Sequence, residues 1–198
     1  MMMRLLLIVP ALALAACATE KEPPVLVMTT DAGVIEIEMA VMEAPLSAAN
    51  FLRLADGGHL DGAGFYRVVR PENDNGEPVI SVVQGGIQDA PQPFPPIPHE
   101  STDQTGLRHI DGAISMARLE PGSASTEFFI CIGDQPALDF GGERNADGQG
   151  FAVFGRVVAG MEVVRAIHAT PADQLGGSAY VAGQILADPV RITSVSIQ

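Results

Sequence analysis

The sequence predicts a mostly β fold, built as an antiparallel sandwich or as a closed barrel, with two helices. Seven or eight short strand-like runs follow one another, and each is bounded by Gly, Pro, Asn or Asp. Only two segments have the spacing of an amphipathic helix. The 198 residues include 21 glycines and 15 prolines. This composition is rich in loops but lies below the share, about 25–30%, that indicates low-complexity disorder. Periodicity alone does not choose between a sandwich and a barrel.

The predicted domain begins with a hairpin and a helix. Residues 25–30 are rich in β-formers, and a turn signal separates them from 35–39, where apolar residues alternate with glutamates. Residues 47–56 change to helical spacing, with Ser47 as the expected N-cap. The two glycines at 57–58 are expected to end this helix.

The rest of the chain alternates short strands with turns and holds the second predicted helix. Strand-like runs lie at 65–70, 79–84, 113–116, 127–132 and 151–157. Gly160 leads into a helix over 161–168. The chain closes on a strand at 190–197. There the apolar phase shifts between Ile192 and Val195, which suggests a bulge or burial on both faces.

The first 16 residues have the pattern of a secretory signal. One basic residue, Arg4, precedes an apolar run that is shorter than the roughly 20 residues of a transmembrane helix. The run ends in Leu-Ala-Ala-Cys, which resembles the lipobox of bacterial lipoproteins, whose cysteine becomes the lipidated first residue of the mature chain. Cys17 is therefore the expected lipidation site. An ordinary signal cut near Ala16 or Ala18, with Cys17 incidental, is the alternative.

These features divide the chain into three parts. Residues 1–16 are the expected lipoprotein signal peptide, 17–24 a polar, lipidated tether and 25–198 the folded domain. We expect an exported protein that faces the periplasm and is anchored in the lipid bilayer through acylated Cys17. Ala18, rather than Asp, follows the cysteine, and in lipoprotein sorting this favours the outer membrane over the inner one.

Charge and cysteine content exclude several classes of function. The formal net charge of −13 repels phosphate backbones, so no nucleic-acid partner is expected. Two cysteines cannot build a disulfide scaffold, and Cys131 lies in an apolar run that predicts a buried, unreactive thiol. The four histidines lack metal-ligand spacing, and no Gly-x-Ser-x-Gly elbow occurs. We therefore expect no metal, no cofactor and no nucleophile.

Three predicted strands place polar residues beside apolar ones. Arg67 is expected to share a face with Phe65 and Val69, where a guanidinium is costly unless it has a partner or a cleft. Gln84 and Glu127 likewise share a face with an apolar residue of their own strands. Taken singly, each of these residues is an ordinary strand residue.

Six short motifs occur in a definite order. They read Phe-Tyr-Arg-Val-Val, Val-Gln-Gly-Gly, Gly-Ala-Ile-Ser-Met-Ala, Glu-Phe-Phe-Ile-Cys, Ala-Leu-Asp and Phe-Ala-Val-Phe-Gly-Arg-Val. In this order they resemble the cyclophilins, which are peptidyl-prolyl cis-trans isomerases. The resemblance spans residue 25 to the C-terminus and implies a closed eight-stranded antiparallel barrel capped by two α-helices.

The resemblance also implies roles for individual residues. Arg67 matches the family's catalytic arginine, and Gln84 matches the glutamine beside it. The expected substrate-binding residues, at or beside the proline pocket, are Phe129, Leu138, Met116, Ala117, Val82, Phe151 and Glu127. The implied partners are proline-containing polypeptides, no cofactor is required, and a monomer is expected.

Two departures from the family pattern bear on the function. An insertion at 71–78 replaces a tight turn, and Glu127 replaces a glutamine. Glu127 could pair with Arg67, either orienting it or competing with substrate. The predicted function is isomerisation of Xaa-Pro bonds in exported proteins, which assists their folding. The alternative is a non-catalytic proline-peptide binding module or chaperone on the same fold.

Overall fold

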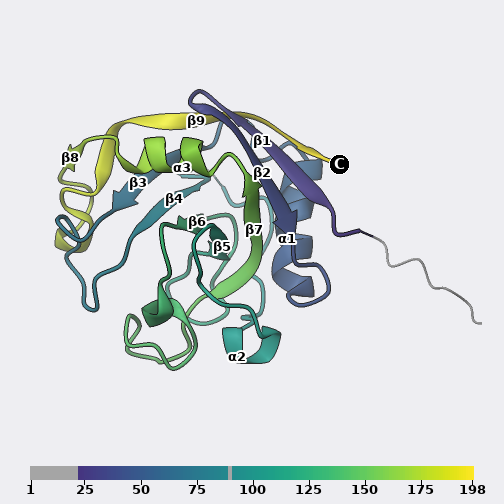
Figure 1. The fold of residues 1–198 in the computed structure, drawn as a ribbon, viewed down its shortest axis with the longest axis horizontal. Coiled ribbons are helices and arrows are strands. Elements are labelled where there is room, and N and C mark those ends of the chain that lie inside the picture. Colours follow the sequence, from purple (N-terminus) through teal and green to yellow (C-terminus); the bar gives the residue numbers. More distant parts are fainter. Residues whose placement is uncertain (1–21, 89–90) are drawn as a thin grey trace, which may run out of the picture.

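The computed structural model describes residues 22–88 and 91–198 and shows a closed antiparallel barrel flanked by helices (Figure 1). The predicted signal peptide and Cys17 lie outside the described residues. The strands are β1 (Val25–Thr30), β2 (Gly33–Met39), β3 (Gly64–Val69), β4 (Val82–Gly86), β5 (Ala113–Met116), β6 (Phe128–Cys131), β7 (Ala152–Ala159), β8 (Ala172–Gln174) and β9 (Ile185–Ile197). The α-helices are α1 (Pro45–Asp56), α2 (Thr102–Thr105) and α3 (Met161–His168).

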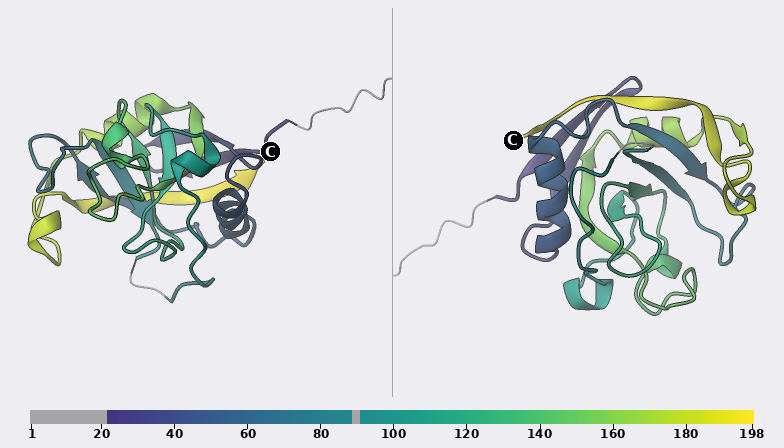
Figure 2. Two further views of the ribbon diagram at one scale, coloured as in Figure 1. Left: turned by 90° about the horizontal axis from the view of Figure 1, so that it is seen from below. Right: turned by 180° about the vertical axis from the view of Figure 1, so that it is seen from behind.

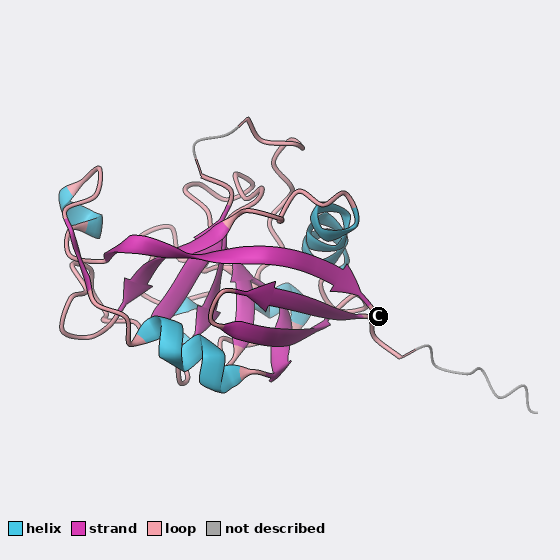
Figure 3. Ribbon diagram, turned by 90° about the horizontal axis from the view of Figure 1, so that it is seen from above, coloured by secondary structure: helices cyan, strands magenta, loops and turns pink. Residues whose placement is uncertain are grey.

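Eight of these strands close into the barrel. Their order is β1-β2-β7-β5-β6-β4-β3-β9, and the pairing of β1 with β9 closes the ring. The short strand β8 pairs only with β9, outside the ring. Helices α1 and α3 lie on opposite sides of the long strand β9 (Figure 3). The predicted eight-stranded barrel with two capping helices is therefore confirmed, whereas β8 and the four-residue helix α2 were not predicted.

Most predicted elements form close to their expected bounds. The β1–β2 hairpin has the register that its turn signal predicts, with Thr30 opposite Gly33. Helix α3 has its predicted bounds, whereas β4 starts later and β9 earlier than predicted. The bulge suggested near the C-terminus is confirmed: Thr29 pairs with Ser194 and Thr30 with Ile192, which leaves one residue of β9 unpaired.

A second bulge, at Tyr66, changes which face of β3 carries each side chain. The register of β3 against both β4 and β9 shifts between Phe65 and Arg67. Phe65 and Val68 belong to the barrel interior, whereas Val69 belongs to an apolar cluster on the outer side. The prediction that Phe65, Arg67 and Val69 share one face is therefore wrong, because the extra residue turns Phe65 inward and Arg67 outward.

The apolar residues form two clusters, one on each side of the sheet. In the interior, Phe51 of α1 contacts Phe128 of β6 edge to face, with ring centroids 5.1 Å apart. The outer cluster consists of Val69, Ile80, Val82, Ala113, Phe129, Cys131, Leu138 and Val153. Successive residues of β6 alternate between the two clusters, which explains why all four of its residues are buried. Cys131 is fully buried, and burial raises the pKa of its thiol above the usual value, as expected for an unreactive cysteine.

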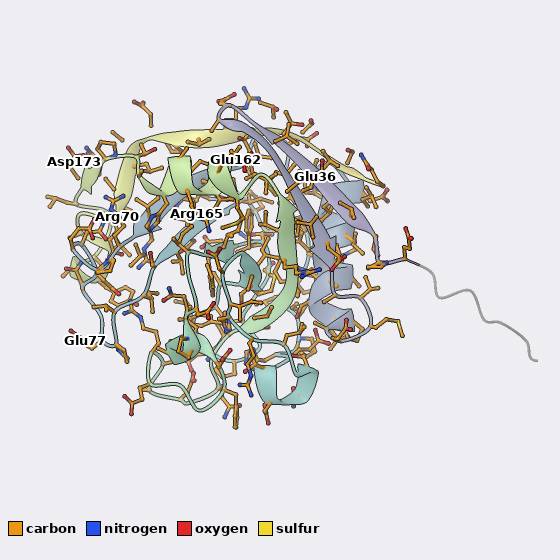
Figure 4. All side chains as sticks on the ribbon, viewed as in Figure 1. Glu36, Arg70, Glu77, Glu162, Arg165 and Asp173 are labelled. Carbon is orange, nitrogen blue, oxygen red and sulfur yellow. The ribbon has the colours of Figure 1, made fainter. Side chains whose placement is uncertain are left out.

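The two ends of the folded domain lie next to each other on the barrel. The N–H of Gln198 donates to the carbonyl of Val25 at 2.9 Å. Figure 2 shows the first described residues, 22–24, beside the C-terminus. Figure 4 shows Glu77, which lies in the 71–78 insertion, on the opposite side of the domain. No helix among the described residues is long and apolar enough to cross a bilayer.

Helix α1 begins at Pro45, so the prediction that Ser47 caps it is wrong. The N-cap position is Ala44, which makes no side-chain cap. Instead the buried carboxylate of Glu100 accepts hydrogen bonds from the N–H of Leu46 at 3.0 Å and from the N–H and hydroxyl of Ser47 at 2.7 Å each. An anion at this helix end satisfies free N–H groups and interacts favourably with the helix dipole.

Replacing Glu100 by Ala should lower the free energy of unfolding by about 1–3 kcal/mol, because two helix N–H groups and a hydroxyl lose a buried acceptor. Urea denaturation at pH 7 measures this change. Glu43→Ala is the matched control, since it removes an exposed carboxylate near the same helix end. We expect the control to change stability by less than about 0.5 kcal/mol. Equal stabilities of the two variants would contradict the capping role of Glu100.

Candidate active site

An open cavity of about 720 Å³ lies on the outer wall of the barrel, over β3, β4 and β6. The predicted site residues that line it are Arg67, Val82, Gln84, Ala117, Glu127, Phe129, Leu138 and Phe151. Met116 does not line it. Its side chain is 1% exposed and packs in the barrel interior, because successive residues of β5 face opposite sides of the sheet. The prediction that Met116 contacts substrate is therefore wrong, and its neighbour Ala117 occupies the rim.

One wall of the cavity is apolar. Val82 of β4, Phe129 of β6 and Leu138, which lies in the short 3-10 turn Pro136–Leu138, form its buried part. Phe151 packs against Phe129 edge to face, with centroids 5.2 Å apart. These four side chains offer a firm apolar surface to a small ring.

Arg67 lies at the edge of this wall and is held by two amides. Its Nη1 donates to Oε1 of Gln84 at 2.8 Å. Its Nε and Nη2 donate to Oε1 of Gln184 at 2.8 and 2.6 Å. Burial lowers the pKa of Arg67 from its usual value, but an arginine still carries its charge at neutral pH. In such a partly desolvated place, a hydrogen bond donated by the guanidinium is stronger than it would be in water.

Glu127 does not pair with Arg67, so the predicted contact between them is wrong. Its Oε2 accepts from the hydroxyl of Tyr66 at 2.5 Å and from Nε2 of Gln84 at 2.9 Å. Nε2 of Gln84 also donates to the Tyr66 hydroxyl at 2.6 Å. Burial and the adjacent Glu127 carboxylate raise the pKa of Tyr66 far above its usual value, so the phenol stays neutral. Glu127 therefore acts on Arg67 only through Gln84.

The 71–78 insertion supports a second wall of the cavity through an ion pair. Nη1 and Nη2 of Arg144 each donate to Asp74 at 2.8 Å, and the two side chains are only 2% and 0% exposed. Nη2 of Arg144 also donates to the hydroxyl of Tyr180 at 2.8 Å. The Tyr180 ring, which lines the cavity, thereby lies with its centroid 5.3 Å from Cζ of Arg67.

A buried polar triad lies behind the apolar wall. The Nδ1 atom of His109 is 2.8 Å from Asp139, its Nε2 is 3.0 Å from the Ser115 hydroxyl, and its ring stacks on Phe129 at 5.9 Å. Burial lowers the pKa of His109, although Asp139 opposes this shift. Ser115 is fully buried, so its hydroxyl cannot reach a ligand in the cavity. The triad supports the wall rather than acting as a nucleophile.

Comparison with known proteins agrees with this geometry. A family profile described as "Cyclophilin type peptidyl-prolyl cis-trans isomerase/CLD" matches residues 25–197. The chain belongs to this family. It is 38% identical over 153 residues to peptidyl-prolyl cis-trans isomerase A of Dickeya dadantii, which covers 75% of this chain and 73% of the relative. It is 34% identical over 173 residues to peptidyl-prolyl cis-trans isomerase cyp18 of Streptomyces antibioticus, over 86% of this chain and 96% of the relative. The predicted family and enzyme class are confirmed.

Solved structures show the same fold. A crystal structure of a cyclophilin-type peptidyl-prolyl cis-trans isomerase from Cryptosporidium parvum superposes with a TM-score of 0.66 at 18% identity, over 89% of this chain and 97% of that one. A second structure of that protein, in the presence of the dipeptide Ala-Pro, gives a TM-score of 0.67 at 18% identity, over 88% and 98% of the two chains. These likenesses establish the barrel as a cyclophilin barrel.

Within the described part of the chain, no three His, Cys, Asp or Glu side chains gather as a metal site. Sequence reasoning did miss two residues of the cavity region, Gln184 and Tyr180. Both lie between β8 and β9, in a segment without hydrophobic periodicity. Only the folded chain brings them to Arg67, and their residue types alone carry no signal of that contact.

Asp74 should make the stability of the domain depend on acidic pH. Burial by itself raises the pKa of Asp74, but hydrogen bonds from Arg144 and from the N–H groups of Ile80 and Gly76 lower it overall. A carboxyl whose folded-state pKa lies below its unfolded value of about 3.9 contributes stability above that pH, and the contribution is lost as the pH falls through the folded-state pKa. Asp74→Ala should therefore cost about 3–5 kcal/mol at pH 7, because Arg144 is left buried without its partner.

Urea denaturation at pH 7, 5 and 3 measures this dependence for wild type and Asp74→Ala. The difference in unfolding free energy should be similar at pH 7 and 5 and should shrink at pH 3. Glu77→Ala removes an exposed carboxylate from the same insertion and is the matched control. A difference that stays constant down to pH 3 would show that the charge of Asp74 does not stabilise the fold.

Proposed function

We propose that the cavity catalyses cis-trans isomerisation of Xaa-Pro peptide bonds, with Arg67 as the catalytic residue and Gln84 beside it. One observation supports this more than any other. Of the five N–H bonds of the Arg67 guanidinium, three donate to Gln84 and Gln184. The second N–H on Nη1 and on Nη2 is engaged by neither amide, and Arg67 lines the cavity together with Tyr180.

The chemistry of the reaction suits this arrangement. Rotation about the Xaa-Pro amide is slow because resonance must be broken, with a barrier of about 18–20 kcal/mol. In the twisted transition state the prolyl nitrogen regains its lone pair and can accept a hydrogen bond that the planar amide cannot. A guanidinium held at that point stabilises the transition state more than the ground state. No bond is broken, so neither a nucleophile nor a cofactor is needed.

The apolar wall of Val82, Phe129, Leu138 and Phe151 is suited to hold the proline ring while the preceding carbonyl swings. Ala117, a small residue at the rim, leaves room for the residue before the proline. The Cryptosporidium parvum structure obtained in the presence of Ala-Pro supports ligands of this class. We therefore propose proline-containing polypeptides as the substrates. A monomer as the active form stays an expectation from the sequence.

Arg67→Ala should lower kcat/KM for a short Xaa-Pro peptide by about 100- to 1,000-fold, the usual effect of removing a transition-state donor. A protease-free isomerisation assay on the full-length chain in detergent measures this. Arg156→Ala is a matched control, because it removes an exposed arginine on β7, away from the cavity. If wild type binds the peptide but does not accelerate isomerisation, the chain is a binding module rather than an enzyme.

We also propose that the protein is exported and anchored at the periplasmic side of the membrane through acylated Cys17, more favourably in the outer membrane. The Leu-Ala-Ala-Cys motif supports the anchor. The described chain supports its orientation, since residues 22–24 lie on the side of the barrel opposite Glu77, which belongs to the insertion that holds Arg144 at the cavity (Figure 4). An anchored domain would thus direct its cavity away from the bilayer. Its substrates would be exported proteins whose folding waits on Xaa-Pro isomerisation.

Cys17→Ser should abolish incorporation of labelled palmitate when the full-length chain is expressed in a Gram-negative host. The wild-type chain should incorporate the label and sediment with the membrane fraction. Cys131→Ser is the matched control, because Cys131 is the second of the two cysteines and is buried in the outer cluster. Labelling that persists in Cys17→Ser would rule out the proposed anchor.

A further inference from the structure

Gln184 connects the 71–78 insertion to Arg67. The residue is fully buried and directly precedes the final strand, β9. Its Oε1 accepts from Nε and Nη2 of Arg67 at 2.8 and 2.6 Å, and its Nε2 donates to the backbone carbonyl of Asn73 at 2.8 Å. The Asn73 side chain donates to the carbonyls of Val68 and Gly183, at 3.2 and 2.9 Å. The insertion is thereby fastened both to β3 and to the residue before Gln184.

We infer that Gln184 is a positioning residue for Arg67, and that the insertion supplies the fixed acceptor that sets the direction of its amide. This inference rests on the proposed function, since it concerns how Arg67 is presented to substrate. Gln184 itself does not line the cavity.

The direction of the amide follows from the chemistry of its neighbours. A backbone carbonyl can only accept, so the Asn73 carbonyl requires Nε2 of Gln184 on its side. Oε1 must then face Arg67, whose guanidinium can only donate. A reversed amide would set two donors against each other and two acceptors against each other, at the cost of buried unpaired groups.

The same logic holds on the other side of the guanidinium. The Glu127 carboxylate accepts from Nε2 of Gln84, so Oε1 of Gln84 must face Nη1 of Arg67. The side-chain amides of Gln84 and Gln184, each with a fixed direction, thus accept hydrogen bonds from all three guanidinium nitrogens of Arg67. The Gln184 contact engages Nε and Nη2 together, which fixes the plane of the guanidinium as well as its position. A misplacement of about 1 Å in such a group can cost about 100-fold in rate.

Gln184→Met removes the acceptor while keeping the length of the side chain. We expect kcat/KM for a tetrapeptide containing Ala-Pro to fall by about 10- to 100-fold. The dissociation constant for the same peptide, from an NMR titration, should change by less than about threefold, because Arg67 acts mainly in the transition state. Gln135→Met is the matched control. It removes a glutamine that bridges the Ser81 N–H and the Ile132 carbonyl, outside the contacts of Arg67.

A double-mutant cycle separates positioning from general structural damage. With Arg67→Ala as background, measured at high enzyme concentration, Gln184→Met should reduce the residual kcat/KM by no more than about twofold, because no guanidinium remains to be positioned. Equal fold losses in the two backgrounds would overturn the inference. The inference would also be overturned if Gln184→Met were as active as the control Gln135→Met. In that case, loss of activity in Arg67→Ala would still support the proposed function. An Arg67→Ala variant as active as wild type would instead overturn the proposed function.

If Gln184→Met does not fold, Gln184→Glu provides the test. The carboxylate keeps an acceptor toward Arg67 but loses the donor to the Asn73 carbonyl. The free energy of unfolding should fall. The kcat/KM of the folded variant should drop by less than about tenfold, which is a smaller loss than the approximately 100-fold expected for a misplaced guanidinium. A folded Gln184→Glu as inactive as Arg67→Ala would contradict the positioning role.

Discussion

The bulge at Tyr66 is the constraint on which the rest of the site depends. In a regular strand, Phe65 and Arg67 would face the same side, and the guanidinium would enter the apolar barrel interior at a large desolvation cost. The register shift places Phe65 inside and turns Arg67 to the outer wall. The Tyr66 hydroxyl then reaches Glu127, so the bulge also supplies a member of the network around Gln84. One extra residue thus places Arg67 on the outer wall and brings the Tyr66 hydroxyl into the hydrogen-bond network beside it.

Burial on both faces explains why the barrel can carry a site on its wall without weakening its core. Neighbouring residues serve different purposes: Phe128 fills the interior, whereas Phe129 forms the cavity wall. Met116 and Ala117 divide in the same way. A resemblance that matches whole motifs cannot make this distinction, because it carries over a residue without the direction of its side chain. The error at Met116 has this origin, and strand alternation corrects it.

The parts of the structure that could be predicted are those encoded locally. Hydrophobic period and turn residues predicted the hairpin, α3 and most strands, and the order of the motifs predicted the closed barrel. Three of the failures involve partners distant in sequence. The sequence suggests Ser47 as the cap, but the helix end is capped by Glu100, which lies more than 50 residues away in the sequence. The sequence also suggests that Glu127 pairs with Arg67, but the Glu127 carboxylate accepts hydrogen bonds from Tyr66 and Gln84 instead. Gln184 has no local signal, because its importance comes only from the contacts that folding creates.

The position of Glu127 resolves the electrostatic problem that its charge raises. A carboxylate bonded directly to Arg67 would neutralise the guanidinium and occupy the N–H groups that a twisted prolyl amide needs. Held one amide away, by Tyr66 and Gln84, the carboxylate occupies no N–H group of Arg67 and fixes the direction of the Gln84 amide, whose oxygen accepts from Nη1. The raised pKa of Tyr66 keeps the phenol neutral, so no second negative charge develops beside Glu127. The acidic substitution is therefore compatible with a catalytic Arg67, because the carboxylate orients the amide beside the cation without taking the place of the substrate.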